Sequence, residues 1–134
     1  MNLFKPTRFR LRTMAFAVAA VAVAAYSTRE WALLRDARNQ FESALDGWEH
    51  SGMTAENVVL ASRRLMNTEA ASPWTSEGMA VKRHLERMDR VLEDAEYLVN
   101  SQSEKRLWPE WAKRQADFVR REIDKHRTPS NPDP

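Results

Sequence analysis

The chain has 134 residues, no cysteine, and 21 basic against 19 acidic residues. The lack of cysteine excludes disulfides, thiolate metal sites and cysteine nucleophiles. Four of the basic residues stand within the first twelve positions, and without them the balance is 17 to 19. The remainder is therefore close to neutral, which argues against nucleic-acid binding.

The basic leader, residues 1–12, is followed by a run of 16 uncharged residues from Thr13 to Thr28. A membrane-spanning helix needs about 20 apolar residues, and a shorter one is met by local thinning of the bilayer. We expect a transmembrane anchor over residues 13–30, in the inner (cell) membrane. Because basic residues precede the run and acidic ones begin at Glu30, the N-terminus is expected in the cytoplasm and the rest in the periplasm or outside the cell. The residues expected to meet the membrane are Arg10, Arg12, Phe16, Val18, Val21, Val23, Tyr26 and Trp31.

The same segment also has the pattern of a secretory signal peptide. Met14–Val23 makes an apolar region, and Ala22-Val23-Ala24 satisfies the cleavage pattern. No proline or glycine separates this segment from the next predicted helix, which favours an uncleaved anchor. Cleavage near Ala24 is the alternative, and it would release a secreted helical bundle that binds a small apolar ligand.

Spacings of three and four between apolar residues predict helices throughout residues 31–126. The first stripe runs from Trp31 to Trp48 and the second from Val58 to Met66. Breaks are expected at Ser51-Gly52 and Ser72-Pro73. The third stripe is predicted to be Val81, Leu85, Met88, Leu92, Ala95 and Val99, and the fourth Trp111, Gln115, Phe118, Glu122 and Ile123, after Pro109.

The predicted fold class is therefore all-α: an N-terminal transmembrane helix, then a three- or four-helix bundle or a helical hairpin. The proline-rich residues 127–134 are predicted to be a disordered tail.

No pattern of residues indicates catalysis, a cofactor or a metal. His50, His84 and His126 are far apart in sequence and are each expected on the surface. An enzyme would require histidines or carboxylates from separate helices to converge. Arg87 and Arg90 lie among the acidic residues Asp89, Glu93, Asp94 and Glu96, and this mixture predicts a solvated helix face rather than a cation site.

Trp74 and Trp108 each precede a predicted helix. They either pack onto the bundle or contact a partner, since aromatic residues dominate binding hot spots. The basic pair Arg63 and Arg64 is a second candidate contact surface. The expected partner is an unidentified protein or a second copy of the chain.

The stretch from Gly52 to Ala70 resembles a helical segment of outer-membrane efflux (TolC-like) proteins, in which a turn leads into a Val-Leu-x-Ala helix and then a leucine with an Ala/Glu stretch. Here the matching residues are Val59-Leu60, Leu65 and Glu69-Ala70. The leader Phe9–Thr13 with its alanine and valine span looks like the anchors of uncharacterised single-pass bacterial membrane proteins. The resemblance implies a helical hairpin that packs laterally against other helices; the chain lacks that family's strands and length. Together these patterns predict a membrane-anchored helical protein–protein interaction module.

Overall fold

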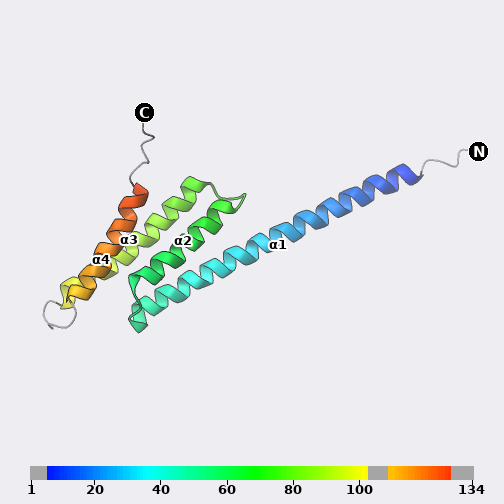
Figure 1. Cartoon of the computed structure of the whole chain (residues 1–134). Coiled ribbons are helices and arrows are strands. Elements are labelled where there is room, and N and C mark those ends of the chain that lie inside the picture. Colours follow the sequence, from blue (N-terminus) through cyan, green and yellow to red (C-terminus); the bar gives the residue numbers. More distant parts are fainter. Residues whose placement is uncertain (1–5, 103–108, 128–134) are drawn as a thin grey trace, which may run out of the picture. The chain divides into compact units, whose positions relative to one another are not determined.

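The structure, a computed structural model, describes residues 6–102 and 109–127 (Figure 1). Four helices make up this part of the chain: α1 Pro6–Ser51, α2 Ala55–Ala71, α3 Glu77–Gln102 and α4 Pro109–Arg127. The all-α prediction is confirmed. Trp108 and residues 128–134, predicted as a contact and as a disordered tail, lie outside the described residues.

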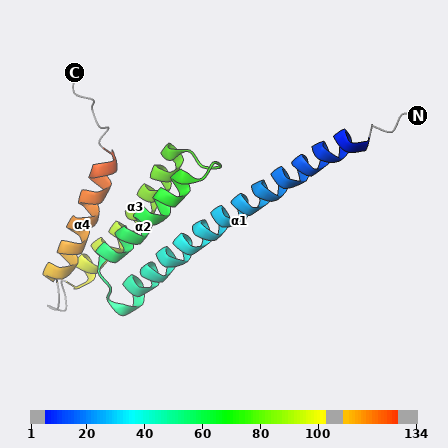
Figure 2. The same ribbon diagram turned by 45° about the vertical axis from the view of Figure 1, so that its right-hand side comes forward.

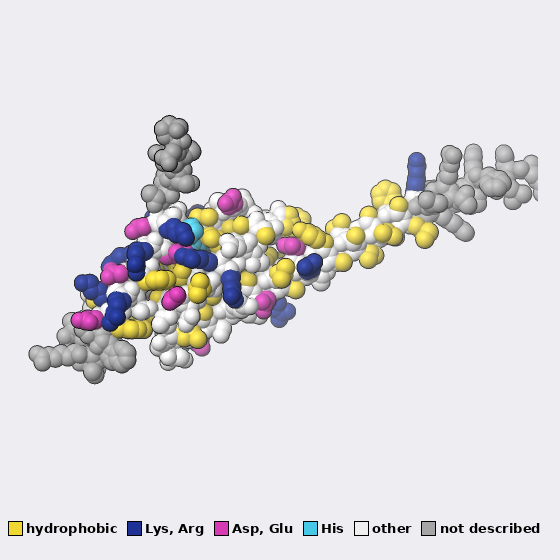
Figure 3. All heavy atoms as spheres, viewed as in Figure 1, with side chains coloured by type: hydrophobic (Ala, Val, Ile, Leu, Met, Phe, Trp, Pro, Cys, Tyr) yellow, Lys and Arg dark blue, Asp and Glu magenta, His cyan; other side chains and the backbone are white. Residues whose placement is uncertain are grey.

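The chain divides into two compact units, Met1–Leu33 and Leu34–Pro134, and the long helix α1 contributes to both. In the first unit the uncharged run is helical, and its large apolar side chains are exposed. Figure 3 shows apolar side chains along this stretch, whereas charged side chains gather over the second unit. Arg10 lies in α1, in a part where only the backbone is described.

Within the described residues, no helix combines the length and apolar character needed to cross a membrane. The expected transmembrane helix over residues 13–30 is therefore not supported by this finding. The reason is visible in the sequence: Arg12 and Arg29 bracket the run after only 16 residues, and many of those are alanine.

The connections between helices are short and have identifiable causes. Gly52 follows α1 with φ at +67°, and the amide of Met53 donates to the carbonyl of Gly47 at 3.1 Å. Glycine adopts this left-handed conformation without the steric cost that a Cβ brings. At the start of α3, the Ser76 hydroxyl oxygen accepts from the amide of Met79 at 3.2 Å, which caps the helix.

The second unit has one core to which all four helices contribute, as in a four-helix bundle (Figure 2). Trp48 of α1 stacks on Trp111 of α4, with ring centroids 5.8 Å apart. The buried cluster consists of Trp48, Ala55, Val58, Val59, Met88, Val91, Ala95, Ala116, Val119 and Ile123. The partly buried Phe41, Ala44 and Leu45 of α1 pack against it.

The stripe predicted for α3 is displaced around the helix. Val81, Leu85, Leu92 and Val99 are only partly buried. The fully buried positions are Ala80, His84, Met88, Val91 and Ala95. This rotation puts a histidine in the interior of the bundle, where the polar partners described below satisfy it.

Alanine substitution at Gly52 and at Gly78 tests the role of the left-handed turn between α1 and α2. A Cβ at either position meets no atom within 4 Å, so a substitution by alanine changes only the backbone preferences. Gly52→Ala is expected to lower the free energy of unfolding by about 1 kcal/mol, because only Gly52 has a positive φ. Gly78→Ala, inside α3, is expected to raise it by about 0.5 kcal/mol. Equal effects in denaturant unfolding of the full chain would contradict this account.

Candidate functional site

The carboxylate of Glu122 on α4 is buried and receives hydrogen bonds from three side chains. Arg63 of α2 donates from Nε to Oε1 at 2.5 Å and from Nη2 to Oε2. His84 Nε2 and His126 Nε2 each lie 3.2 Å from the same Oε1. Glu122 is 4% exposed and His84 0%. We call these four side chains the Glu122 cluster.

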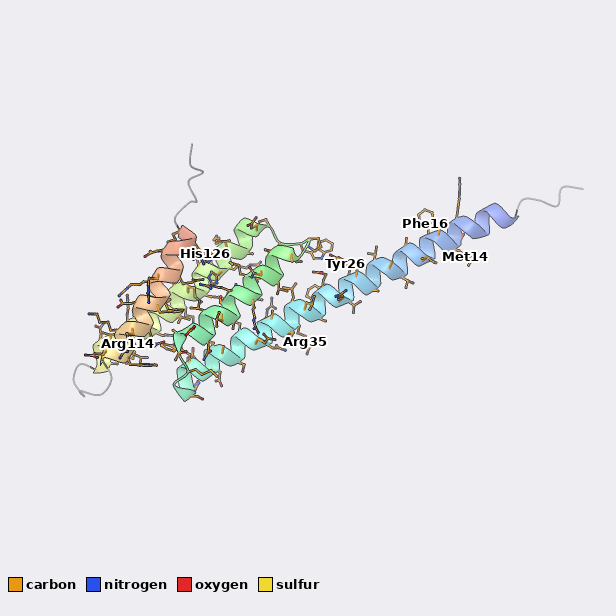
Figure 4. The ribbon with its side chains drawn as sticks, in the orientation of Figure 1. Met14, Phe16, Tyr26, Arg35, Arg114 and His126 are labelled. Carbon is orange, nitrogen blue, oxygen red and sulfur yellow. The ribbon has the colours of Figure 1, made fainter. Side chains whose placement is uncertain are left out.

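Helix geometry explains how the cluster is assembled. His126 follows Glu122 by four residues, so both side chains lie on one face of α4. His84 comes from α3, and its ring lies edge-on to that of His126, with centroids 5.0 Å apart. Figure 4 shows His126 near the C-terminal end of α4. The cluster thus ties α2, α3 and α4 together.

A second layer of hydrogen bonds fixes the ring of His84. Its Nδ1 lies 2.8 Å from the hydroxyl oxygen of Ser62, which in turn accepts from Arg87 Nε at 2.9 Å. Because the ionised carboxylate of Glu122 can only accept, the neutral His84 is assigned its proton on Nε2, directed at Glu122, and its Nδ1 then accepts from the Ser62 hydroxyl. Arg87 also reaches Glu69, at 3.3 Å.

Burial and neighbouring charges set the ionisation of the cluster. Burial lowers the pKa of His84 from 6.5 to about 4, although its hydrogen bond to Glu122 opposes this. Burial raises the pKa of Glu122, but the hydrogen bonds and charge of Arg63, with the bond from His84, outweigh it and lower the pKa to about 2. At neutral pH the cluster therefore holds an anionic Glu122, a cationic Arg63 and a neutral His84.

Ser62, His84 and Glu122 follow one another as the members of a serine-nucleophile triad would. A nucleophile must be reached by its substrate, and Ser62 and His84 are both 0% exposed. The order of groups therefore orients the His84 ring and does not activate the hydroxyl.

The prediction that each histidine lies on the surface is wrong for His84. The prediction holds for His50, whose side chain is 70% exposed beside Asp46. His126 lies between these two cases, because its side chain is 19% exposed. Two features of the sequence point to buried polar residues at Glu122 and His84. Glu122 lies on the predicted apolar stripe of its helix. His84 lies four residues after Ala80 and four residues before Met88, so it shares a helix face with these two apolar residues.

The predicted contact residues lie in different surroundings. Trp74, in the α2–α3 connection, is 79% exposed. Arg63 is engaged in the Glu122 cluster, with 36% of its side chain exposed. Arg64 is exposed and donates to Gln40 Oε1 of α1 at 3.3 Å. Two residues of the predicted acidic face of α3 form ion pairs with α4: Asp89 with Arg127 and Glu96 with Arg120.

An open groove of about 700 Å³ lies between the start of α2 and α4. Its lining is Thr54, Glu56, Arg114, Gln115, Asp117, Phe118, Arg120 and Arg121. Gln115 closes one side by accepting from the amide of Ala55 at 2.8 Å. Five of the eight lining residues are charged and the groove is open, which differs from the enclosed cavity that binding of a small apolar ligand requires.

Comparison with known proteins finds no matching family model, no matching curated protein and no matching solved structure. The resemblance of residues 52–70 to efflux proteins therefore stays a prediction.

The pKa values of the cluster predict that acid destabilises the bundle. Between pH 6.5 and about 4, the unfolded chain binds a proton at His84 that the folded chain does not. The free energy of unfolding should then fall by about 1.4 kcal/mol for each pH unit in that window. Glu122 adds a further loss between pH 4.5 and about 2, because only its unfolded carboxyl is protonated there.

Denaturant unfolding of the full chain, followed by circular dichroism at a series of pH values, measures this slope. His84→Gln, which cannot be protonated, should remove most of it above about pH 5. A wild-type free energy of unfolding that stays constant from about pH 7 to about pH 5 would show that His84 is not held neutral.

Proposed function

We propose that the protein is a membrane-attached helical module that acts through contacts with other proteins. The observation that carries this proposal is the exposed apolar surface of the N-terminal part of α1. The exposed fractions there are Met14 68%, Phe16 75%, Val18 68%, Val21 69%, Val23 65% and Tyr26 57%.

These side chains do not share one face of the helix. Figure 4 shows Met14 and Phe16 on different sides of α1. A helix that is apolar all round is normally covered by a protein core or by a membrane. No charged residue interrupts the run from Thr13 to Thr28. We infer that lipid covers this surface.

The flanks of the run suit a membrane as well. Arg12 precedes it, and a long basic side chain can extend toward the head groups. Tyr26 and Trp31, 57% and 67% exposed, follow where aromatic residues prefer the interface. Sixteen residues are short of the usual span, and local thinning of the bilayer accommodates the difference. The basic leader favours the cytoplasm for the N-terminus.

The contact surface of the bundle is proposed to centre on Trp74. Its backbone amide donates to the Ser72 hydroxyl oxygen at 3.4 Å, in the connection between α2 and α3. A large apolar ring that is 79% exposed gains most when a partner buries it. The alternative, a secreted bundle that binds an apolar ligand, gains no comparable support from the open groove between α2 and α4.

Membrane attachment is tested with Val21, near the centre of the uncharged run. Full-length protein is mixed with lipid vesicles and separated by flotation. Wild-type protein is expected to float with the vesicles. Val21→Asp should weaken partitioning about a hundredfold, since a central charge costs about 3 kcal/mol.

The matched control is Leu60→Asp, which places the same charge at a leucine of α2 that is 47% exposed; it should float like wild type. If Val21→Asp floats normally, the run is not the anchor. If the wild-type protein stays off the vesicles and forms a Val21-dependent oligomer, the run is a helix–helix interface and the membrane proposal is wrong.

The contact role of Trp74 is tested by cross-linking in native membranes. Trp74→Ala is expected to remove cross-linked species while changing the free energy of unfolding by less than about 0.5 kcal/mol, because the ring is exposed. Tyr97→Ala, at an aromatic residue of α3 that is 71% exposed, is the matched control and should leave them. An unchanged set of species with Trp74→Ala would remove the main support for this surface.

A further inference from the structure

We propose that His84, Glu122 and His126 form a binding site for a divalent transition-metal ion, with Zn²⁺ the best fit. One ligand atom from each residue, His84 Nε2, Glu122 Oε1 and His126 Nε2, lies within 4.8 Å of the others. This inference goes beyond membrane attachment and partner contact, and it does not depend on them.

The distances between the donor atoms suit a small tetrahedral ion. Each histidine Nε2 is 3.2 Å from Glu122 Oε1. With bonds of about 2.0 to 2.1 Å to nitrogen and oxygen, neighbouring ligands in a tetrahedral zinc site are about 3.3 Å apart. The two N–O distances therefore already match such a site, whereas the two histidine nitrogens lie within 4.8 Å of each other and would draw together as the ion replaces the two N–H···O hydrogen bonds.

The donor types select the class of metal. Two imidazole nitrogens and one carboxylate oxygen suit Zn²⁺ and its neighbours in the first transition row. Ca²⁺ and Mg²⁺ prefer sites made of oxygen, with six or more ligands for Ca²⁺. Three protein ligands also leave a fourth position for solvent, which reaches the site on the side of His126, 19% exposed.

The surroundings of His84 provide the outer support that metal-binding histidines require. Such a histidine normally gives its second ring N–H to a fixed acceptor, which orients the ring. Ser62 Oγ lies 2.8 Å from Nδ1 and is held by Arg87 at 2.9 Å. The hydroxyl donates to Nδ1 when Nε2 carries the proton, and it accepts from Nδ1–H when Nε2 binds a metal.

Arg63 is the competitor of the metal ion. Its Nε donates to the same Glu122 Oε1 that the metal needs, at 2.5 Å, while its Nη2 donates to Oε2. Because the Arg63 side chain is 36% exposed, its head group can move toward solvent and keep only the Oε2 bond. A nearby cation lowers the affinity for a divalent ion, so removal of the Arg63 charge should raise it.

The test titrates the full-length chain in detergent micelles with Co²⁺, a spectroscopic probe for zinc sites, followed by displacement with Zn²⁺. One Co²⁺ per chain is expected, with the visible absorption of a low-coordinate site. His126→Ala should weaken binding at least about tenfold, since a ligand is lost. His50→Ala, which removes an exposed histidine near Asp46, should bind like wild type.

Arg63→Gln separates a metal site from a purely structural network. If the cluster binds metal, Arg63→Gln should tighten Co²⁺ binding about tenfold or more. Tighter binding supports the proposal, and unchanged or weaker binding in a folded variant counts against it.

Histidine NMR of the wild-type chain gives a readout that needs no variant. On addition of Zn²⁺, the Nε2 resonances of His84 and His126 should shift while those of His50 stay. Absence of stoichiometric Co²⁺ binding, or binding that survives His126→Ala and is lost in His50→Ala, would overturn the proposal.

Discussion

The carboxylate of Glu122 is the constraint on which the packing of α2, α3 and α4 depends. An ionised carboxylate is costly to bury unless its oxygens are paired and hydrogen-bonded. Glu122 meets this demand through Arg63 of α2, His84 of α3 and His126 one turn further along α4. Groups from three helices thus satisfy a single charge, and this requirement fixes how the three helices lie around one another. Apolar contacts alone would tolerate sliding or rotation of these helices more easily.

The sequence predicted the elements of the fold better than the interior of the bundle. Apolar periodicity located the helices, and Gly52, Pro73 and Pro109 marked their limits, because these signals are local. The face of α3 could not be found in the same way. Val81, Leu85 and Leu92 are better apolar candidates than Ala80 and His84, and only partners on α2 and α4 make His84 a residue of the interior.

The Glu122 cluster is likewise beyond the reach of local sequence patterns. His84 and Glu122 are 38 positions apart, and no spacing rule joins them. A charged residue on an otherwise apolar stripe, as Glu122 is, indicates that a cation or donor on another helix faces it. As half of the basic pair with Arg64, Arg63 is predicted from the sequence to be a surface contact. Its pairing across 59 positions of sequence became visible only in the packed bundle.

The position of His126 near the end of α4 has a consequence for how the bundle opens. Helix ends normally fray at little cost, because the last turn has few contacts. Here, fraying of the last turn of α4 would withdraw the His126 donor from Glu122, which lies one turn earlier in the same helix. Partial opening would thus leave a buried anion poorly satisfied, at a cost beyond that of the broken helical turn. The end of α4 should therefore exchange its amide hydrogens slowly, together with the middle of α3, as one cooperative unit.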